Sequence, residues 1–206
     1  MKMQSESQIL ASGARELGFE LTADEQAKLL EYMALMQKWN KVYNLTAIKN
    51  GPEMVTHHLL DSLAVLPHLW GGRWLDVGCG GGLPGIVLAI MRPEWDFTLL
   101  DSNSKKTGFV QQVAVQLKLK NVRVHTGRVE DWQKGETFDG IISRAFTEIG
   151  NFFRLTEGLL APGGRWAAMK GKLEEEIPLQ YRIDRIITLQ VPGLDASRSL
   201  VIAGRK

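Results

Sequence analysis

The sequence has almost no cysteine and no long apolar run. Cys79 is the only cysteine among 206 residues, so no disulfide can form within the chain and a cysteine-based metal cage is excluded. No apolar run approaches the roughly 18 residues of a membrane-spanning helix, and the first 20 residues lack a signal-peptide pattern. We therefore expect a cytoplasmic protein that uses no metal and does not contact a membrane.

The sequence also lacks a strong excess of charge of one sign. The net charge is +2, and 44% hydrophobic residues are typical of a globular protein. Residues 1–70 hold 6 Lys or Arg and 8 Asp or Glu, whereas residues 71–206 hold 19 and 15. A polyanionic substrate is compatible with this distribution, but so is an ordinary mixed surface.

The pattern of apolar residues changes near residue 70. Helical spacing extends over 5–17, 24–40 and 52–67, and Thr22 with Glu25 forms a capping box before the second helix. From Arg73 onward short apolar strands alternate with helices, which indicates parallel βαβ units. We predict an α/β fold with helices on both faces of a parallel sheet, joined at Gly71-Gly72 to a helical cap over residues 1–70. The second part, residues 71–206, would form one compact unit with this cap.

The predicted elements of the second part have these bounds. Strands are expected at 74–77, 97–100, 122–125, 138–143, 165–169, 185–190 and 198–203, and helices at 86–91, 105–119 and 151–160. A tight turn is expected at 161–164, and residues 173–181 are expected to be partly helical. The last two strands are expected to form an antiparallel hairpin.

A glycine-rich loop over residues 78–85 follows the first predicted strand and contains five glycines in eight positions. Two ligand patterns overlap there. Gly80-x-Gly82-x-x-Gly85 matches the fingerprint of nicotinamide-dinucleotide sites. Asp76-x-Gly78-x-Gly80-x-Gly82 matches the acid-x-Gly-x-Gly-x-Gly pattern of S-adenosylmethionine-dependent methyltransferases.

Three observations favour the second pattern. Asp76 precedes the glycines, where a carboxylate would repel a pyrophosphate but attract the ammonium and sulfonium of S-adenosylmethionine. Asp101 ends the second strand, about 20 residues further on, where an acid binds a ribose diol. The antiparallel hairpin closes the sheet as it does in methyltransferases. A purely structural glycine turn is the remaining alternative.

Further candidate residues follow the third and fourth strands. Val129 and Glu130 are expected to contact the adenine, although Glu130 could instead be a charge at a helix N-terminus. Arg144 ends the fourth strand, where it could hold the cofactor carboxylate or the substrate; a surface arginine is the alternative. We expect Arg144 to position the reactants without acting as a general base.

Several catalytic signatures of other methyltransferases are missing. No Asn-Pro-Pro-Tyr or Asp-Pro-Pro-Tyr follows the fourth strand, which disfavours methylation of an exocyclic amine, and no cysteine is placed to attack a pyrimidine. A ring nitrogen such as guanine N7 needs neither, because it has a free lone pair and no proton to remove. Orientation and desolvation would then carry the catalysis.

Six blocks of the sequence together resemble the bacterial RsmG (GidB) family from end to end. They are Trp39-Asn40-Lys41-x-Tyr43-Asn44-Leu45-Thr46, His58-Leu59-Leu60-Asp61-Ser62-Leu63, Asp76-Val77-Gly78-x-Gly80-x-Gly82-Leu83-Pro84-Gly85-Ile86, Leu99-Leu100-Asp101-Ser102-x-x-Lys105-Lys106, Ser143-Arg144-Ala145 and Lys170-Gly171. The glycine loop alone is typical of any class I methyltransferase. The flanking blocks, in this order, make the resemblance specific.

The resemblance implies methylation of N7 of a guanine in 16S ribosomal RNA, guanine 527 in the decoding-site loop, by a protein that binds this RNA or the small ribosomal subunit. We separately expect the protein to be a monomer. By motif position it implies cofactor contacts from Gly78, Leu83, Val129, Glu130 and Arg144. The loop chemistry adds Asp76, Gly80 and Asp101.

The RNA-binding residues are less well specified by the sequence. A basic rim at the C-terminal edge of the sheet is expected from these residues: Arg123, Arg128, Arg144, Lys170, Arg198, Arg205 and Lys206. Trp132, Phe146 and Tyr43 are candidates for stacking on the base, although such aromatic residues more often belong to the core. His57 and His58 are expected to pack or cap, with Asp61 bonded to His58.

Three other functions remain open at this point. A helical cap also suits a methyltransferase of small molecules, and the glycine pattern leaves a nicotinamide oxidoreductase possible. A ribosome-assembly factor with a vestigial cofactor fold is a third alternative, which the intact Asp76, glycines and Asp101 disfavour.

Overall fold

The computed structural model describes residues 5–132 and 135–206. Its first third is helical. The elements are α1 (Glu6–Glu16), α2 (Ala23–Tyr43), α3 (Gly51–Met54), the π-helical turn η1 (Val55–Leu60), α4 (Asp61–Leu63) and the 3₁₀ turn η2 (Leu66–His68). Among the described helices, none has both the length and the apolar character needed to cross a membrane.

The N-termini of the first two helices are fixed by side chains. The Thr22 hydroxyl accepts a hydrogen bond from the Glu25 N–H, and the Glu25 carboxylate accepts from the Thr22 N–H. This confirms the predicted capping box, and Ser5 with Gln8 forms a second one. Helix α2 runs to Tyr43, three residues beyond its predicted end, and stops at Asn44, whose φ of 49° is left-handed.

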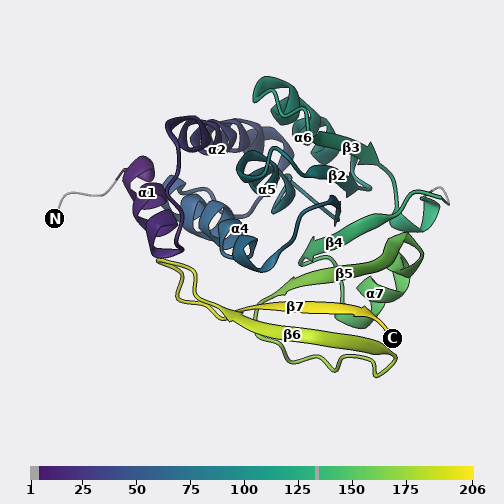
Figure 1. Cartoon of the computed structure of the whole chain (residues 1–206). Helices are drawn as coiled ribbons and strands as arrows, with labels where there is room; N and C mark the ends of the chain where they lie inside the picture. Colours follow the sequence, from purple (N-terminus) through teal and green to yellow (C-terminus); the bar gives the residue numbers. More distant parts are fainter. Residues whose placement is uncertain (1–4, 133–134) are drawn as a thin grey trace.

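The rest of the chain is built around one seven-stranded sheet with the strand order β3-β2-β1-β4-β5-β7-β6 (Figure 1). The strands are β1 (Arg73–Val77), β2 (Asp96–Asp101), β3 (Val122–Thr126), β4 (Phe138–Arg144), β5 (Leu160–Lys170), β6 (Tyr181–Leu189) and β7 (Arg198–Arg205). Strands β1 to β5 are parallel, whereas β7 runs antiparallel to both β5 and β6. The predicted parallel sheet and closing hairpin are therefore confirmed.

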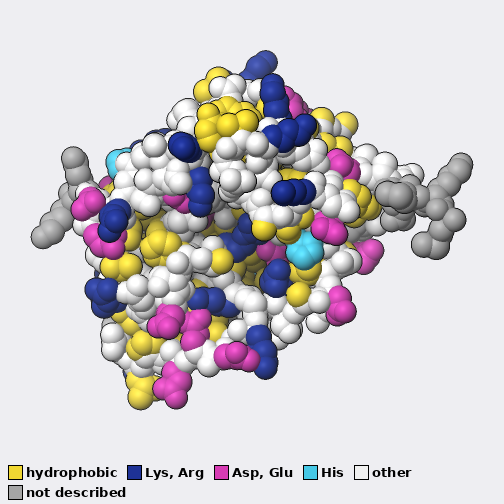
Figure 2. Space-filling view, turned by 180° about the vertical axis from the view of Figure 1, so that it is seen from behind, with side chains coloured by type: hydrophobic (Ala, Val, Ile, Leu, Met, Phe, Trp, Pro, Cys, Tyr) yellow, Lys and Arg dark blue, Asp and Glu magenta, His cyan; other side chains and the backbone are white. Residues whose placement is uncertain are grey.

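Helices cover both faces of the sheet, as predicted. Helices α5 (Gly85–Met91) and α6 (Ser104–Gln116) lie with the helical first third on one face, and α7 (Ile149–Thr156) with the 3₁₀ turn η4 (Glu157–Leu159) lies on the other (Figure 1). A 3₁₀ turn η3 (Val129–Asp131) follows β3. Seen from behind, the molecule is hollowed near its centre, with Lys and Arg side chains in and around the hollow (Figure 2).

Alternate residues of β1 divide the core into two clusters. Trp74 packs in the cluster that contains the first helices, α5 and α6, while Leu75 and Val77 pack in the cluster that contains α7. This follows from the twofold alternation of side chains along a strand. These three side chains are fully buried, so β1 lies between the two clusters and contributes to both.

The predicted turn at residues 161–164 is wrong. These residues belong to β5, which begins at Leu160 and shifts its register against β4 between Phe138 and Gly140. Gly163 has a φ of +78°, which suits a bulge as well as a turn. The Pro-Gly-Gly signal therefore marked an irregular strand.

The predicted helix within residues 173–181 is also wrong, because the segment that joins β5 to β6 contains no helix. Glu175 from the acidic run forms an ion pair with Lys170 (2.7 Å) and accepts a hydrogen bond from the N–H of Ile149 at the start of α7. These contacts hold the segment against β5 and α7 in an irregular conformation.

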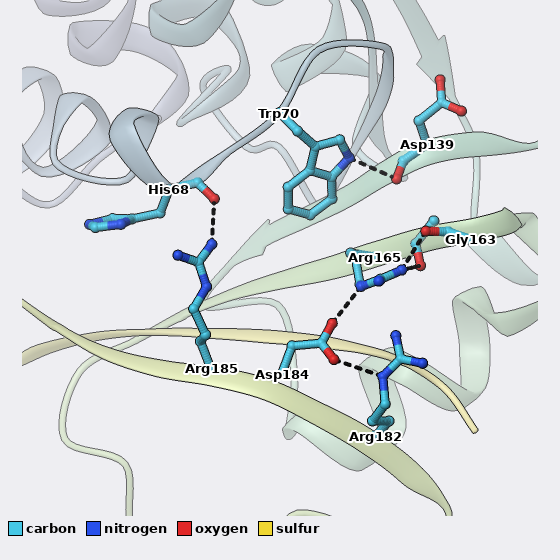
Figure 3. A network of polar contacts seen from close by, with 9 residues as sticks. His68, Trp70, Asp139, Gly163, Arg165, Arg182, Asp184 and Arg185 are labelled. Carbon is cyan, nitrogen blue, oxygen red and sulfur yellow. Dashed lines mark hydrogen bonds and ion pairs between the residues drawn. The ribbon is translucent and has the colours of Figure 1, made fainter.

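Polar contacts join the end of the helical segment to the amino edge of the sheet (Figure 3). Arg185 of β6 donates to the His68 carbonyl (3.2 Å), and the Trp70 indole donates to the Asp139 carbonyl (3.1 Å). Nearby, Asp184 binds both Arg165 and Arg182. The two predicted parts are thus in close contact, and their division at residue 70 stays a prediction.

A buried hydroxyl joins α2 to the glycine loop. Tyr32 is fully buried and donates to the Gly81 carbonyl at 2.6 Å. We expect Tyr32→Phe to lower the free energy of unfolding by about 1 kcal/mol, because the substitution leaves this carbonyl unpaired. Urea unfolding measures the effect. Tyr43→Phe, at a partly exposed position of the same helix, is the control and should unfold like the wild type; equal stability of both variants would contradict the role of this contact.

Candidate functional site

The glycine loop is shaped by the strands beneath it. The N–H groups of Gly78 and Cys79 donate to the Leu100 carbonyl at 2.8 and 3.0 Å, so the end of β2 fixes the start of the loop. Gly80 has a φ of +57°, and a Cβ built there would meet no atom within 4 Å. The backbone at Gly80 therefore faces open space, which a ligand can approach closely.

Asp76 lies beneath this loop, fully buried. Its Oδ2 accepts the N–H of Gly85 at 2.8 Å, whereas its Oδ1 has no hydrogen-bond partner among the described residues. Burial raises the pKa of Asp76 to about 7, against the opposing effects of the Gly85 hydrogen bond and of Arg144. The structure does not bring Asp76 to the wall of either cavity described below.

Two cavities adjoin at the carboxyl ends of the parallel strands. The cap cavity, about 590 Å³, is lined by loop and strand-end residues that include Gly78, Gly80, Leu83, Arg144, Lys170 and Arg198. The strand cavity, about 360 Å³, is lined by residues that include Asp101, Arg128, Val129, Glu130 and Phe146. Gly78, Lys106 and Ala145 line both, so the two cavities share a wall.

Nearly all predicted cofactor residues thus lie around these two cavities, in two groups. Gly80, Leu83 and Arg144 line the cap cavity, and Asp101, Val129 and Glu130 line the strand cavity. Of the predicted cofactor residues, only Asp76 lies outside both linings. A ligand that touches both groups must extend from one cavity into the other, past Gly78.

Asp101 organises the loop and the following helix together. Its Oδ2 accepts the Gly80 N–H at 2.9 Å, and its Oδ1 accepts the Asn103 N–H at 2.8 Å. Asn103 in turn caps α6 through the N–H groups of Lys105 and Lys106. The carboxylate is therefore held in one orientation at the wall of the strand cavity.

A buried carboxylate joins two arginines in the cap cavity. Asp61, with 1% of its surface exposed, accepts from Arg144 at 3.2 Å and from Arg198 at 2.8 Å. Arg144 also donates to the His57 carbonyl at 3.0 Å. The three charged side chains come from α4, β4 and β7, so the contact closes the cavity from three directions.

The expected bond between Asp61 and His58 is wrong, because both carboxylate oxygens already bind arginines. His58 instead pairs with Thr46: its Nε2 lies 2.9 Å from the Thr46 hydroxyl. Burial, together with the positive charge of Arg144, lowers the pKa of His58 to about 4. His58 is therefore a neutral packing residue in the cavity wall, as the sequence indicated.

The segment 44–48 forms another wall of the cap cavity. The Asn40 side chain donates to the Thr46 carbonyl and accepts from the Thr46 N–H, both at 2.9 Å. The Thr46 hydroxyl also accepts the Ile48 N–H at 3.1 Å. This explains why the block from Trp39 to Thr46 combines an asparagine and a threonine at this spacing.

The predicted basic rim forms only in part. Arg144, Lys170 and Arg198 line the cap cavity and Arg128 lines the strand cavity. Arg123 pairs with Glu136 at 3.0 Å outside both cavities, and Arg205 binds the Glu157 and Leu160 carbonyls at the opposite edge of the sheet. The expectation is wrong for Arg205 and its neighbour Lys206, because β7 runs antiparallel and carries them away from the glycine loop.

The three aromatic candidates lie in different surroundings. Phe146 lines the strand cavity, and its ring lies where a Cβ on Gly78 would clash, at 2.6 Å. Trp132 packs against His125 and Phe138. Tyr43, 39% exposed, lies outside both cavities.

Sequence reasoning missed the pairing role of Asp61 and the wall positions of Lys106 and Thr46. An acid on the apolar face of a predicted helix was a signal for the first, since such an acid needs a buried partner. Lys106 and Thr46 lie within blocks that carry the family resemblance, but nothing in their spacing indicates which side chains meet.

Known proteins resemble this chain at the level of sequence and of fold. The family model described as GidB, rRNA small subunit methyltransferase G, matches residues 25–201. A Ribosomal RNA small subunit methyltransferase G from Laribacter hongkongensis is 49% identical over 199 residues, which cover 95% of this chain and 96% of the relative.

Two solved structures share the fold at low sequence identity. A SAM dependent methyltransferase from Aquifex aeolicus has a TM-score of 0.57 at 16% identity, covering 74% of this chain and 93% of its own. A SAM-dependent methyltransferase from Geobacter sulfurreducens in complex with S-adenosyl-L-homocysteine has a TM-score of 0.55 at 12% identity, covering 84% and 98%.

The buried Asp76 predicts a pH dependence of stability. A folded pKa near 7, above the usual 3.8, means that the folded state loses stability as the pH rises from about 4 to about 7. We expect Asp76→Asn, which retains an oxygen for the Gly85 N–H, to gain melting temperature relative to the wild type across this window. Thermal unfolding at several pH values measures the difference, and a difference that does not change with pH would contradict the raised pKa.

Proposed function

Because this chain belongs to the GidB family, rRNA small subunit methyltransferase G, we propose that it methylates N7 of a guanine in 16S ribosomal RNA, guanine 527 of the decoding-site loop. The methyl donor is S-adenosylmethionine, and the reaction takes place in the cytoplasm. One observation carries the proposal: two adjoining cavities meet at Gly78, one cationic and one with a fixed carboxylate. The first suits an RNA nucleotide and the second an adenosine.

The residues present fit the methyl donor. The open approach at Gly80 leaves room for a ligand against the loop, and Asp101 is oriented to accept both hydroxyls of a ribose. Val129 packs against the adenine, and Glu130 accepts a hydrogen bond from it. Asp76 favours a cationic ligand from beneath the loop, since its Oδ1 is unpaired.

When bound, the donor would supply a methyl group on a sulfonium. The guanine N7 lone pair would attack the methyl carbon in line, so that the N7–methyl bond forms while the sulfur–methyl bond breaks and the thioether leaves. This step releases no proton, so no residue needs to act as a base. His58 in the wall of the cap cavity has a pKa lowered to about 4, so its imidazole is a weak base. The chain contributes orientation and exclusion of water.

Arg144 and Arg198 orient the acceptor. Asp61 accepts from Nη1 of Arg144 and from Nε of Arg198, and backbone carbonyls accept from Nη1 of both. These contacts fix both guanidinium groups and leave Nη2 of each for the guanine O6 and for phosphate oxygens. Arg128 at the rim of the strand cavity adds a phosphate contact. Lys170 lines the cap cavity and keeps one N–H for a phosphate beside its bonds to Glu175 and the Thr147 carbonyl. Arg123, which lies apart and is paired with Glu136, is not part of this proposal.

Transfer of labelled methyl groups tests the activity. We expect label from S-adenosylmethionine to enter small ribosomal subunits or 16S rRNA when the protein is present, and to remain absent from a metabolite extract. Calorimetric titration should show binding of S-adenosylhomocysteine and none of NADH. Label confined to metabolites would contradict the RNA substrate, and binding of NADH alone would contradict the methyl donor.

Arg144→Ala should lower kcat/KM for RNA methylation at least about tenfold, since the guanidinium contacts the acceptor. Thermal stability should change little, because Asp61 keeps Arg198 as its partner. Arg182→Ala is the control: it removes a guanidinium paired with Asp184 at the opposite edge of the sheet and should retain full turnover. Normal turnover of Arg144→Ala would count against its place in the site.

A further inference from the structure

A third cavity lies outside the site described above, at the C-terminal end of α2. It has a volume of about 590 Å³, and its polar lining residues are Gln37, Lys38, Asn40, Lys41, Asn44 and Lys49. We call it the lysine cavity. Its lining contains three lysines and no carboxylate, and none of these lysines forms an ion pair within the described part of the chain.

The clustering of these charges has no evident structural cause. Lys41 lies in the last turn of α2, where a cation interacts favourably with the helix dipole. Lys49 belongs to the segment before α3, so the dipole of α2 does not account for it. Three ammonium groups around one hollow repel each other, and a bound polyanion would relieve that repulsion.

Two large apolar side chains are exposed in the last turn of α2, and Tyr43 lies on the other side of the helix from Lys41. Val42 is 71% exposed and Tyr43 39% exposed, although both are large. The Tyr43 ring packs against Trp39 with a centroid distance of 5.3 Å, which restrains its orientation. A restrained aromatic ring at the surface of a helix that also carries lysines suits single-stranded nucleic acid, whose bases stack and whose phosphates are neutralised.

The lysine cavity also lies directly beside the cap cavity. Leu45, Thr46 and Ile48 line the cap cavity, whereas Asn44 and Lys49, the residues on either side of them in the chain, line the lysine cavity. The Asn40–Thr46 hydrogen bonds hold this partition in place. An RNA strand with one nucleotide in the cap cavity therefore reaches the lysine cavity within a few nucleotides.

We propose that the lysine cavity binds backbone phosphates of the same ribosomal RNA strand, next to the nucleotide that enters the cap cavity, while Tyr43 stacks on a neighbouring base. The proposal rests on the proposed function, because it takes its RNA partner from there. It assigns to α2 and the segment 44–49 an RNA-docking role separate from methyl transfer.

The test is a triple variant, Lys38→Gln/Lys41→Gln/Lys49→Gln, with a control that removes three positive charges elsewhere, Arg15→Gln/Lys118→Gln/Lys120→Gln. Binding of a labelled 16S rRNA transcript is measured over a range of salt concentrations. Each phosphate contact on a single strand contributes about 0.7 to the slope of log K against log salt concentration. The loss of three contacts in the triple variant should therefore reduce the magnitude of this slope by about 2. The control should keep the wild-type slope.

Two further measurements separate docking from catalysis. We expect the triple variant to raise KM for RNA at least about fivefold, with kcat at saturating RNA and affinity for S-adenosylhomocysteine unchanged. Tyr43→Ala should weaken RNA binding at least about fivefold without changing the salt slope, since it removes stacking and no charge. Thermal unfolding verifies that the variants are folded.

The outcomes distinguish this proposal from the proposed function. A triple variant with the salt slope and KM of the wild type would overturn the lysine cavity as a docking site, even if methylation is normal. A wild-type protein that binds the transcript without methylating it would contradict the proposed function alone. The salt slopes of the wild type and the triple variant would still show whether the lysines bind RNA.

Discussion

The site depends on the hydrogen bonds that fix the glycine loop to the end of β2. The Leu100 carbonyl accepts the N–H groups of Gly78 and Cys79, and Asp101 accepts that of Gly80. Since a loop rich in glycine has much conformational freedom to lose, these bonds select the one conformation in which Gly80 faces open space. The same carboxylate borders the strand cavity, so the residue that shapes the loop also lines the cavity proposed for the adenosine.

The helical first third completes the site in two ways. Tyr32 of α2 holds the loop from above through the Gly81 carbonyl, and Asp61 binds arginines from β4 and β7. A buried carboxylate that lost both guanidinium partners would be strongly disfavoured, whereas one remaining partner still neutralises its charge. The helices, the central strands and the C-terminal hairpin are therefore coupled at the cavity where the proposal places the acceptor guanine.

Short apolar strands and capping residues could be recognised in the sequence, and the predicted sheet and closing hairpin are confirmed. Most of the residues predicted to bind the cofactor line the two cavities, and their role stays a prediction. The errors have local causes. Pro162-Gly163-Gly164 has the composition of a turn but forms a strand bulge, and the acidic run at 174–176 is held irregular by the contacts of Glu175. The partner of Asp61 was predicted wrongly because sequence spacing does not show which distant side chains meet. The position of Arg205 was predicted wrongly because the spacing does not show at which edge of the sheet an antiparallel strand ends.

The central claim is that this protein transfers a methyl group from S-adenosylmethionine to N7 of a guanine in 16S rRNA. Mass mapping of 16S rRNA fragments from cells with and without this protein tests it most directly. The account predicts N7-methylguanine at position 527 only when the protein is present. The same methylguanine in its absence, or none in its presence, would contradict the account.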